Sequence, residues 1–113
     1  MSEHTISIRS ELIGDKLVVH FQGNLDVHNT HQIEQDLMNM VKSAKTSIVF
    51  NLSDVQFISS AGLRVLVTSL RLCQDLGIKI AICSLRPAVE KVFDIIGMQQ
   101  LFTIHSDLNA ALS

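Results

Sequence analysis

The sequence predicts an α/β domain with a mixed sheet of four to five strands and amphipathic helices. Runs of β-branched and aromatic residues alternate along the chain with segments in which apolar residues recur at helical spacing. Hydrophobic residues make up 47% of the chain and charged residues 18%, a composition that fills one core and excludes a disordered tail. The length of 113 residues matches one domain, so we expect residues 1–113 to fold as a unit.

The first elements are expected to be a hairpin and a helix. Apolar and polar residues alternate over 6–8, which predicts a half-exposed edge strand. A Gly-Asp turn at 14–15 leads into the apolar run 17–21. A helix should begin at Asn29, because Asn29 and Gln32 have the spacing of a capping box. Its buried stripe is expected to contain Ile33, Leu37, Met40 and Val41.

The sequence predicts a second helix after residues 59–62. A buried strand is expected at 47–50, before this helix. Apolar residues recur at helical spacing after residues 59–62, and Gly77 suits the left-handed conformation that often ends a helix. One face repeats apolar residues and should be buried, whereas the opposite face is polar. The buried face contains Leu63, Leu66, Val67, Leu70 and Cys73, and the polar face contains Arg64, Thr68, Arg71 and Asp75.

The C-terminal part continues the alternation of strand and helix. Residues 78–82 form the next expected strand, parallel to the one before it through a right-handed crossover. Pro87 favours the first turn of a third helix, which Gly97 should end. A short strand at 101–104 and a final short helix through Leu112, capped by Ser106 or Asp107, complete the fold. The buried face of the third helix is expected to contain Val89, Val92, Phe93 and Ile96.

Charge and composition exclude several classes of function. The nine basic residues are scattered over a chain of net charge −2, so they do not form the basic footprint that nucleic-acid binding needs. The N-terminus lacks the pattern of a signal peptide, and no apolar run is long enough for a membrane helix. We therefore expect a cytoplasmic protein. In that reducing compartment Cys73 and Cys83 should be small buried hydrophobes.

No catalytic or cofactor site is predicted. His28 and His31 have a spacing compatible with a metal ion, but no third ligand converges on them. The chain contains neither a phosphate loop of Walker type nor a Gly-x-Ser-x-Gly nucleophile motif. We expect no metal, no cofactor and no enzyme activity.

The serine pair before the second helix is the main functional candidate. A helix N-terminus has unpaired N–H groups and a partial positive charge, so it stabilises an anion such as a phosphoserine. Gly62 in the first turn would let a partner or a phosphate approach the backbone closely. The simpler interpretation is that Ser59 or Ser60 only caps the helix. Asp26 likewise has a simpler interpretation as a turn or cap residue.

Three segments, taken in order, resemble the signature of STAS domains of the anti-sigma factor antagonist type. Residues 51–63, Asn-Leu-Ser-Asp-Val-Gln-Phe-Ile-Ser-Ser-Ala-Gly-Leu, resemble its strand, its Asp-containing turn and its Asp-Ser-Ser/Thr/Ala-Gly-Leu helix start. Residues 23–26, Gly-Asn-Leu-Asp, resemble its Gly-Glu-Leu-Asp motif. Residues 84–94 resemble its later Pro-x-Val-x-x-x-Phe helix. Together the matches span nearly the whole chain and imply a STAS-like fold.

The resemblance implies a partner switch. In this family the unphosphorylated antagonist binds an anti-sigma factor that is also a serine kinase of the histidine-kinase-like ATPase fold, and this binding frees the sigma factor. The kinase phosphorylates the antagonist and so expels it, and a metal-dependent serine phosphatase resets it. The phosphoacceptor falls on Ser60. The partner-binding positions expected here are Asp26, Ser59, Gly62 and Arg64.

Two positions depart from the family pattern. Ser59 stands where the family has Asp, and Asn24 stands where it has Glu, so both departures remove negative charge near Ser60. One serine should cap the helix while the other projects outward, and we expect Ser59 to cap and Ser60 to keep a free hydroxyl. We also expect Asp26 and the Arg64 face to border the same docking surface as Ser60.

Two other functions compete with the partner switch. One is a non-phosphorylated structural STAS subunit of a lipid transporter, in which the domain supports an ATPase. The other is nucleotide binding or hydrolysis, which the lack of a phosphate loop disfavours.

Overall fold

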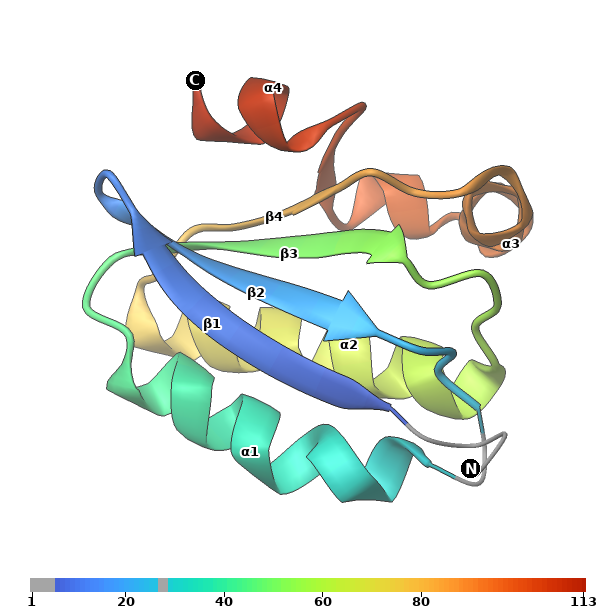
Figure 1. Ribbon diagram of the computed structural model, residues 1–113, viewed down its shortest axis with the longest axis horizontal. Coiled ribbons are helices and arrows are strands. Elements are labelled where there is room, and N and C mark those ends of the chain that lie inside the picture. The colour runs from blue at the N-terminus through green and yellow to red at the C-terminus, as the bar shows by residue number, and fades with distance from the viewer. Residues whose placement is uncertain (1–5, 27–28) are drawn as a thin grey trace.

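Residues 6–26 and 29–113 are described by the computed structural model, in which strands and helices alternate as the sequence predicted (Figure 1). In chain order the elements are β1 (Ser7–Ile13), β2 (Lys16–Gln22), α1 (Thr30–Ser43), β3 (Ser47–Asp54), α2 (Ser60–Leu76), β4 (Ile80–Cys83), α3 (Pro87–Ile96), a 3-10 turn η1 (Met98–Gln100), β5 (Thr103–His105) and α4 (Leu108–Leu112).

One mixed sheet contains all five strands in sequence order. β1 is antiparallel to β2 and joins it through the predicted turn, where Gly14 has a φ of 61°. The remaining neighbours are parallel, with Val18 opposite Val49 and Phe50 opposite Ile82. Parallel neighbours need crossover connections, and α1, α2 and α3 supply them. The predicted mixed sheet is confirmed, although β4 and β5 each begin two residues later than expected.

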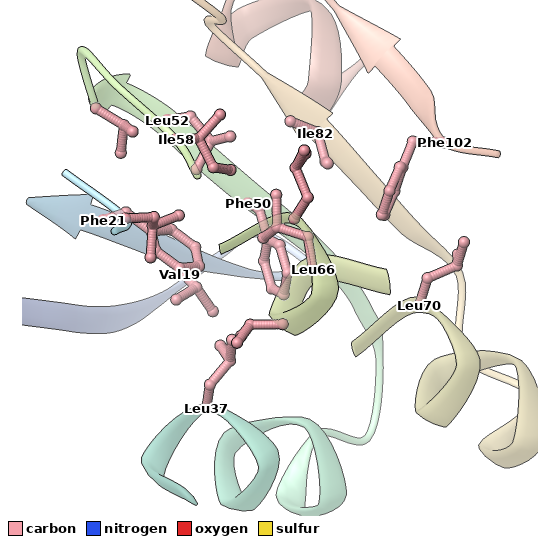
Figure 2. Close-up of a cluster of buried hydrophobic side chains, with 14 of the residues drawn as sticks. Val19, Phe21, Leu37, Phe50, Leu52, Ile58, Leu66, Leu70, Ile82 and Phe102 are labelled. Atoms are coloured by element: carbon pink, nitrogen blue, oxygen red, sulfur yellow. The ribbon is translucent and has the colours of Figure 1, made fainter. Parts of the chain in front are cut away.

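The helices divide between the two faces of the sheet. α1 and α2 lie side by side on one face, and α4 lies on the other (Figure 1). The main core lies between the sheet and the α1–α2 layer, where Phe21 and Phe50 meet edge to face with ring centroids 5.2 Å apart (Figure 2). Leu37 of α1 and Leu66 of α2 enter the same cluster. A smaller cluster under α4 contains Val18, Val49, Cys83 and Ala111.

The predicted faces of α2 agree with the structure. Leu63, Leu66, Leu70 and Cys73 are buried, whereas the four polar residues of the opposite face are exposed. α2 ends at Gly77, whose φ of 71° lies in the left-handed region that side chains disfavour. This geometry confirms the predicted stop.

Some details of the predicted helices are wrong. Asn29 precedes α1, but its side chain makes no capping hydrogen bond. It is instead hydrogen-bonded to the Asp26 N–H and the Asn24 carbonyl. Ile96 is 50% exposed, because it ends α3 next to the turn at Gly97 and faces α2 instead of the sheet. Three further residues of the expected stripes are half-buried: Met40, Val67 and Val92.

Leu66→Ala should lower the free energy of unfolding by about 2–5 kcal/mol, because Leu66 is fully buried between α2 and the sheet and its loss leaves a cavity. Urea denaturation measures this change. The matched control is Gln74→Ala on the exposed face of α2, which should change stability by less than about 0.5 kcal/mol. A change below about 1 kcal/mol for Leu66→Ala would contradict the assigned core.

Candidate functional site

Ser59 and Ser60 stand at the start of α2 and differ in the environment of their hydroxyl groups. Ser59 is extended, with φ −94° and ψ 173°, and its Oγ accepts a hydrogen bond from the Gly62 N–H at 3.2 Å. Ser60 is the first helical residue and is exposed. The prediction that Ser59 caps the helix is confirmed, and Ser60 is the serine that faces solvent.

The chain before Ser59 is held against the loop that follows β2. Leu25 and Ile58 form an isolated parallel bridge, and both side chains are buried. The Leu25 N–H donates to the Phe57 carbonyl at 3.1 Å, and the Ser59 N–H donates to the Leu25 carbonyl at 2.7 Å. Because β2 and β3 are parallel neighbours, the loops after them meet at the same edge of the sheet. This arrangement places Asp26 in the loop beside the serine pair.

Two asparagine side chains fix the geometry of these loops. The Oδ1 of Asn24 accepts hydrogen bonds from the backbone N–H groups of Gln56 at 2.9 Å and Phe57 at 3.0 Å. Asn29 donates from Nδ2 to the Asn24 carbonyl at 2.6 Å. The Oδ1 of Asn29 accepts from the Asp26 N–H at 3.0 Å. Asn29 therefore closes its own loop instead of capping α1.

Sequence reasoning missed this positioning role and identified Asn24 only as a lost negative charge. An amide oxygen has two lone pairs for N–H donors, so Asn24 holds the loop without adding a charge beside Ser60. The available signal was a short amide side chain in the loop after a strand, because asparagine commonly hydrogen-bonds the backbone of loops.

Gly62 has a different use from the one expected. We expected its missing side chain to let a partner or a phosphate approach the backbone. Gly62 is buried, and a Cβ there would lie 2.7 Å from the Leu25 Cβ and 2.9 Å from the Ile58 Cγ1. The lack of a side chain at Gly62 therefore lets Leu25 and Ile58 pack closely against the first turn of α2.

Ser60 lines an open groove of about 440 Å³ between α2 and the end of α3, which we call the α2–α3 groove. Ile96 at its wall is 50% exposed, and Phe57 just before the serine pair is 52% exposed. Sequence reasoning placed Ile96 in the core and did not single out Phe57. The lining residues are Ser60, Leu63, Arg64, Val67, Thr68, Arg71, Ile96 and Met98.

The first turn of α2 and the two arginines of the groove favour an anion at Ser60. The first turn of α2 contains no acidic residue, so nothing within it offsets the partial positive charge of the helix N-terminus. Arg64 lies one helical turn after Ser60 and is exposed in the same groove, with Arg71 further along. Residues four apart are neighbours on a helix surface, so a negative group on Ser60 would lie near the Arg64 guanidinium.

The two cysteines do not line the α2–α3 groove. Both thiols are free and buried, as the sequence predicted. Burial raises the pKa of Cys73 to about 11, and burial is also the main cause of the raised pKa of Cys83. The thiols therefore stay protonated near neutral pH, where they are weak nucleophiles.

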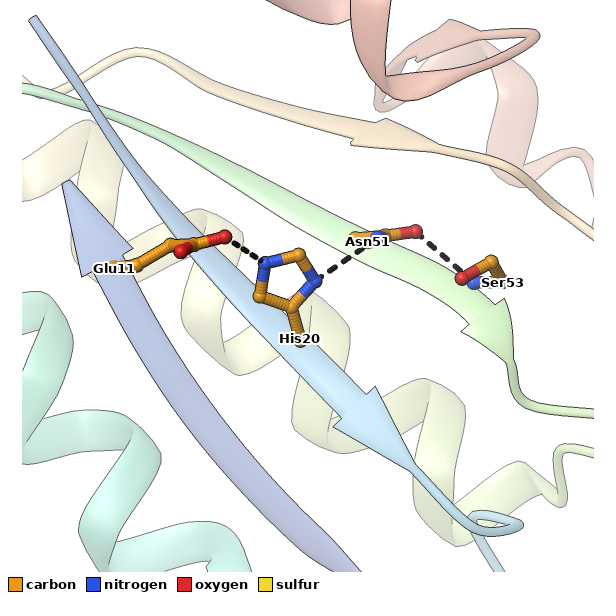
Figure 3. A network of polar contacts seen from close by, with 4 residues as sticks. All are labelled: Glu11, His20, Asn51 and Ser53. Carbon is orange, nitrogen blue, oxygen red and sulfur yellow. Dashed lines mark hydrogen bonds and ion pairs between the residues drawn. The ribbon is translucent and has the colours of Figure 1, made fainter. Parts of the chain in front are cut away.

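The histidines show no metal geometry within the described residues. His28 lies outside them, and His31 is exposed. His20 lies on the α4 side of the sheet, where its Nε2 contacts Glu11 Oε1 at 2.8 Å and its Nδ1 accepts from Asn51 Nδ2 at 3.0 Å (Figure 3). Over 6–26 and 29–113, no group of three His, Cys, Asp or Glu side chains could hold a metal ion. In the same ranges, no helix has the length and apolar character needed to cross a membrane.

Gly62→Ala should destabilise the protein by about 1–3 kcal/mol, because the added methyl group overpacks the contact with Leu25. In an unconstrained helix the same change would be stabilising, so the sign of the effect is informative. Thermal and urea unfolding measure it, with Ser60→Ala at the exposed first position as the control. An unchanged or raised stability for Gly62→Ala would show that the loops can move away from α2.

Comparisons with a family model and with curated proteins point to the same family. A family model for the STAS domain matches residues 7–111. BtrV of Bordetella bronchiseptica, named as a candidate anti-sigma factor antagonist, is 28% identical over 106 residues, which cover 94% of this chain and 91% of BtrV. The anti-sigma F factor antagonist of Paenibacillus polymyxa is 27% identical over 96 residues, which cover 83% of this chain and 82% of that protein.

Solved structures show the same fold. An anti-sigma factor antagonist of Mycobacterium paratuberculosis has a TM-score of 0.85 at 22% identity, with 98% of this chain and 94% of that chain covered. The antagonist SpoIIAA in its unphosphorylated form has a TM-score of 0.75 at 21% identity, with 93% of each chain covered. SpoIIAA of Bacillus in its phosphorylated form has a TM-score of 0.68 at 20% identity, with 93% and 96% covered. The chain therefore belongs to the STAS domain family, and the B. bronchiseptica and P. polymyxa relatives are named as anti-sigma factor antagonists.

Proposed function

We propose that this protein is a partner-switching regulator that binds an anti-sigma factor when unphosphorylated and is released when Ser60 is phosphorylated. The observation behind this proposal is the division of roles between two adjacent serines. Ser59 is engaged as the cap of α2, whereas Ser60 is exposed at the first helical position. A kinase would therefore find one accessible hydroxyl at this helix start.

Phosphorylation would act at the docking surface and leave the fold intact. A phosphoserine carries about −1.5 to −2 charges, and the positive end of the α2 dipole stabilises it at this position. Within a complex, the same dianion would lose its hydration and occupy space that the partner needs. A loss of about 3–4 kcal/mol at the interface would weaken binding several-hundred-fold.

The proposed partner is an anti-sigma factor that is also a serine kinase of the histidine-kinase-like ATPase fold, and a serine phosphatase resets the switch. The names of the P. polymyxa relative and of SpoIIAA support an anti-sigma factor as the partner. SpoIIAA is known in phosphorylated and unphosphorylated forms, which supports control by phosphorylation. The protein would act in the cytoplasm as a binding protein and not as an enzyme.

The proposed docking surface includes the helix start, the neighbouring loop and the α2–α3 groove. Ser60 and Arg64 line that groove together, and Ser59 bonds the carbonyl of the residue before Asp26. Phe57 and Ile96 would add apolar area at its margins, since both are about half exposed. Gly62 would contribute by seating the helix and not by direct contact.

Incubation with the cognate kinase and ATP should add one phosphate, and peptide fragmentation should locate it on Ser60. Ser60→Ala should abolish the modification and leave a constitutive binder, whereas Ser60→Asp should bind weakly because it places a negative charge at the interface. Intact mass and equilibrium binding to the partner measure these outcomes. Phosphate on Ser59, or on neither serine with a proven kinase, would overturn the assignment.

Ser59→Ala separates capping from phosphorylation. This variant loses the acceptor for the Gly62 N–H and should lose about 1 kcal/mol of stability while still being phosphorylated. Denaturation and the same mass analysis measure both effects. Loss of phosphorylation in a folded Ser59→Ala variant would show that the cap is part of kinase recognition.

Asp26→Ala and Arg64→Glu should each weaken partner binding by about 1–3 kcal/mol without unfolding the domain, if the loop and the groove form one interface. The matched control is Lys79→Glu, another exposed charge reversal, which lies before β4 at the other end of the strands. Titration calorimetry of the unphosphorylated protein measures the affinities. Normal binding by both variants would place the interface elsewhere.

A further inference from the structure

β1 forms an open edge of the sheet. It is the outermost strand, and five of its seven residues are exposed. Natural edge strands are usually protected by charged side chains, especially lysine, by proline, by a bulge or by a short length. β1 has two charged side chains, Arg9 and Glu11, but their charges are opposite and do not repel a second copy of the strand. β1 contains no proline or lysine and pairs with β2 over all seven residues in one register. Its outer backbone groups are therefore a template for another strand.

The side chains of β1 are complementary to a second copy of the same strand. In an antiparallel pair with a two-fold axis at Ser10, Arg9 lies opposite Glu11 of the second copy, and Glu11 lies opposite Arg9 of the second copy. Both ion pairs would lie on the sheet face that contains His20, because Arg9 and Glu11 share that side of β1. A carboxylate accepts several hydrogen bonds, so the Glu11–His20 contact can persist.

The same register pairs apolar residues on the opposite face. Leu12 is 67% exposed, and it borders an open groove of about 690 Å³ between the β1–β2 hairpin and the end of α1. Leu17 and Met40 also line this groove. With the axis at Ser10, Ile8 of the second copy would lie opposite Leu12 and cover it. Charge and apolar pairing thus favour one register.

We propose that the protein forms a two-fold homodimer through antiparallel pairing of its two β1 strands, which joins the sheets into one of ten strands. Directly opposite residues of an antiparallel pair point to the same face, so the α1–α2 layers of both copies lie on one side of the joined sheet and both α4 helices on the other. This surface is distinct from the α2–α3 groove, whose helices follow β3 and β4. The proposal does not depend on phosphorylation.

Sedimentation equilibrium of the full unphosphorylated chain should show a concentration-dependent rise to twice the mass of one chain. Arg9→Glu creates two like-charge pairs per dimer and should raise the dissociation constant about 10- to 100-fold. Arg9→Glu combined with Glu11→Arg restores opposite charges and should recover dimerisation. Leu12→Glu should also weaken the dimer, whereas Ile95→Glu, at a 73% exposed site on α3, should not.

A cysteine at the axis tests the register directly. In this register, Ser10 is the only residue of β1 that lies opposite the same residue of the second copy. Ser10→Cys should therefore form an intermolecular disulfide under mild oxidation. Ile95→Cys is the control and should not cross-link at the same concentration, and circular dichroism checks that each variant is folded. A wild-type chain that stays monomeric, or a dimer that tolerates Arg9→Glu and is not cross-linked through Ser10→Cys, would overturn the proposal.

Discussion

The position of Ser60 depends on hydrogen bonds between two loops that are distant in sequence. The Oδ1 of Asn24 holds the N–H of Gln56, which follows 32 positions later, and the Leu25 carbonyl holds the Ser59 N–H. Backbone groups next to buried residues need such partners, because an unpaired polar group there costs about 1–3 kcal/mol. The helix start is therefore fixed by the β2–α1 loop as much as by its own sequence.

This support explains how a switch can operate without unfolding the domain. In the first turn of α2, Gly62 packs closely against Leu25, and the Ser59 side chain caps the helix. Both contacts are made by groups other than the Ser60 hydroxyl. A charge added to Ser60 would therefore change the surface that a partner meets, while the groups that hold the helix stay in place. Under the proposed function, these contacts would keep the effect of a phosphate on Ser60 local to the surface.

The sheet separates the two surfaces that we propose for recognition. The α2–α3 groove is formed by the helices that follow β3 and β4, whereas the open edge of the sheet is formed by β1. The hydrogen bonds from Glu11 through His20 and Asn51 to the Ser53 N–H tie the first three strands together on the α4 side of the sheet (Figure 3). A dimer through β1 would leave the groove available, so one molecule could bind its own copy and a partner at the same time.

The sequence by itself determined the α/β alternation, the buried face of α2 and the stop at Gly77, because hydrophobic spacing and glycine are local signals. Local sequence predicted that Ser59 or Ser60 caps the helix, since capping involves residues within one helical turn, and the family resemblance favoured Ser59, which the structure confirms. Only the tertiary structure decided the roles of Asn24 and Gly62 and the exposure of Ile96. Those roles arise from contacts between segments far apart in the chain, and no periodicity within a segment encodes which loop or groove a side chain will meet.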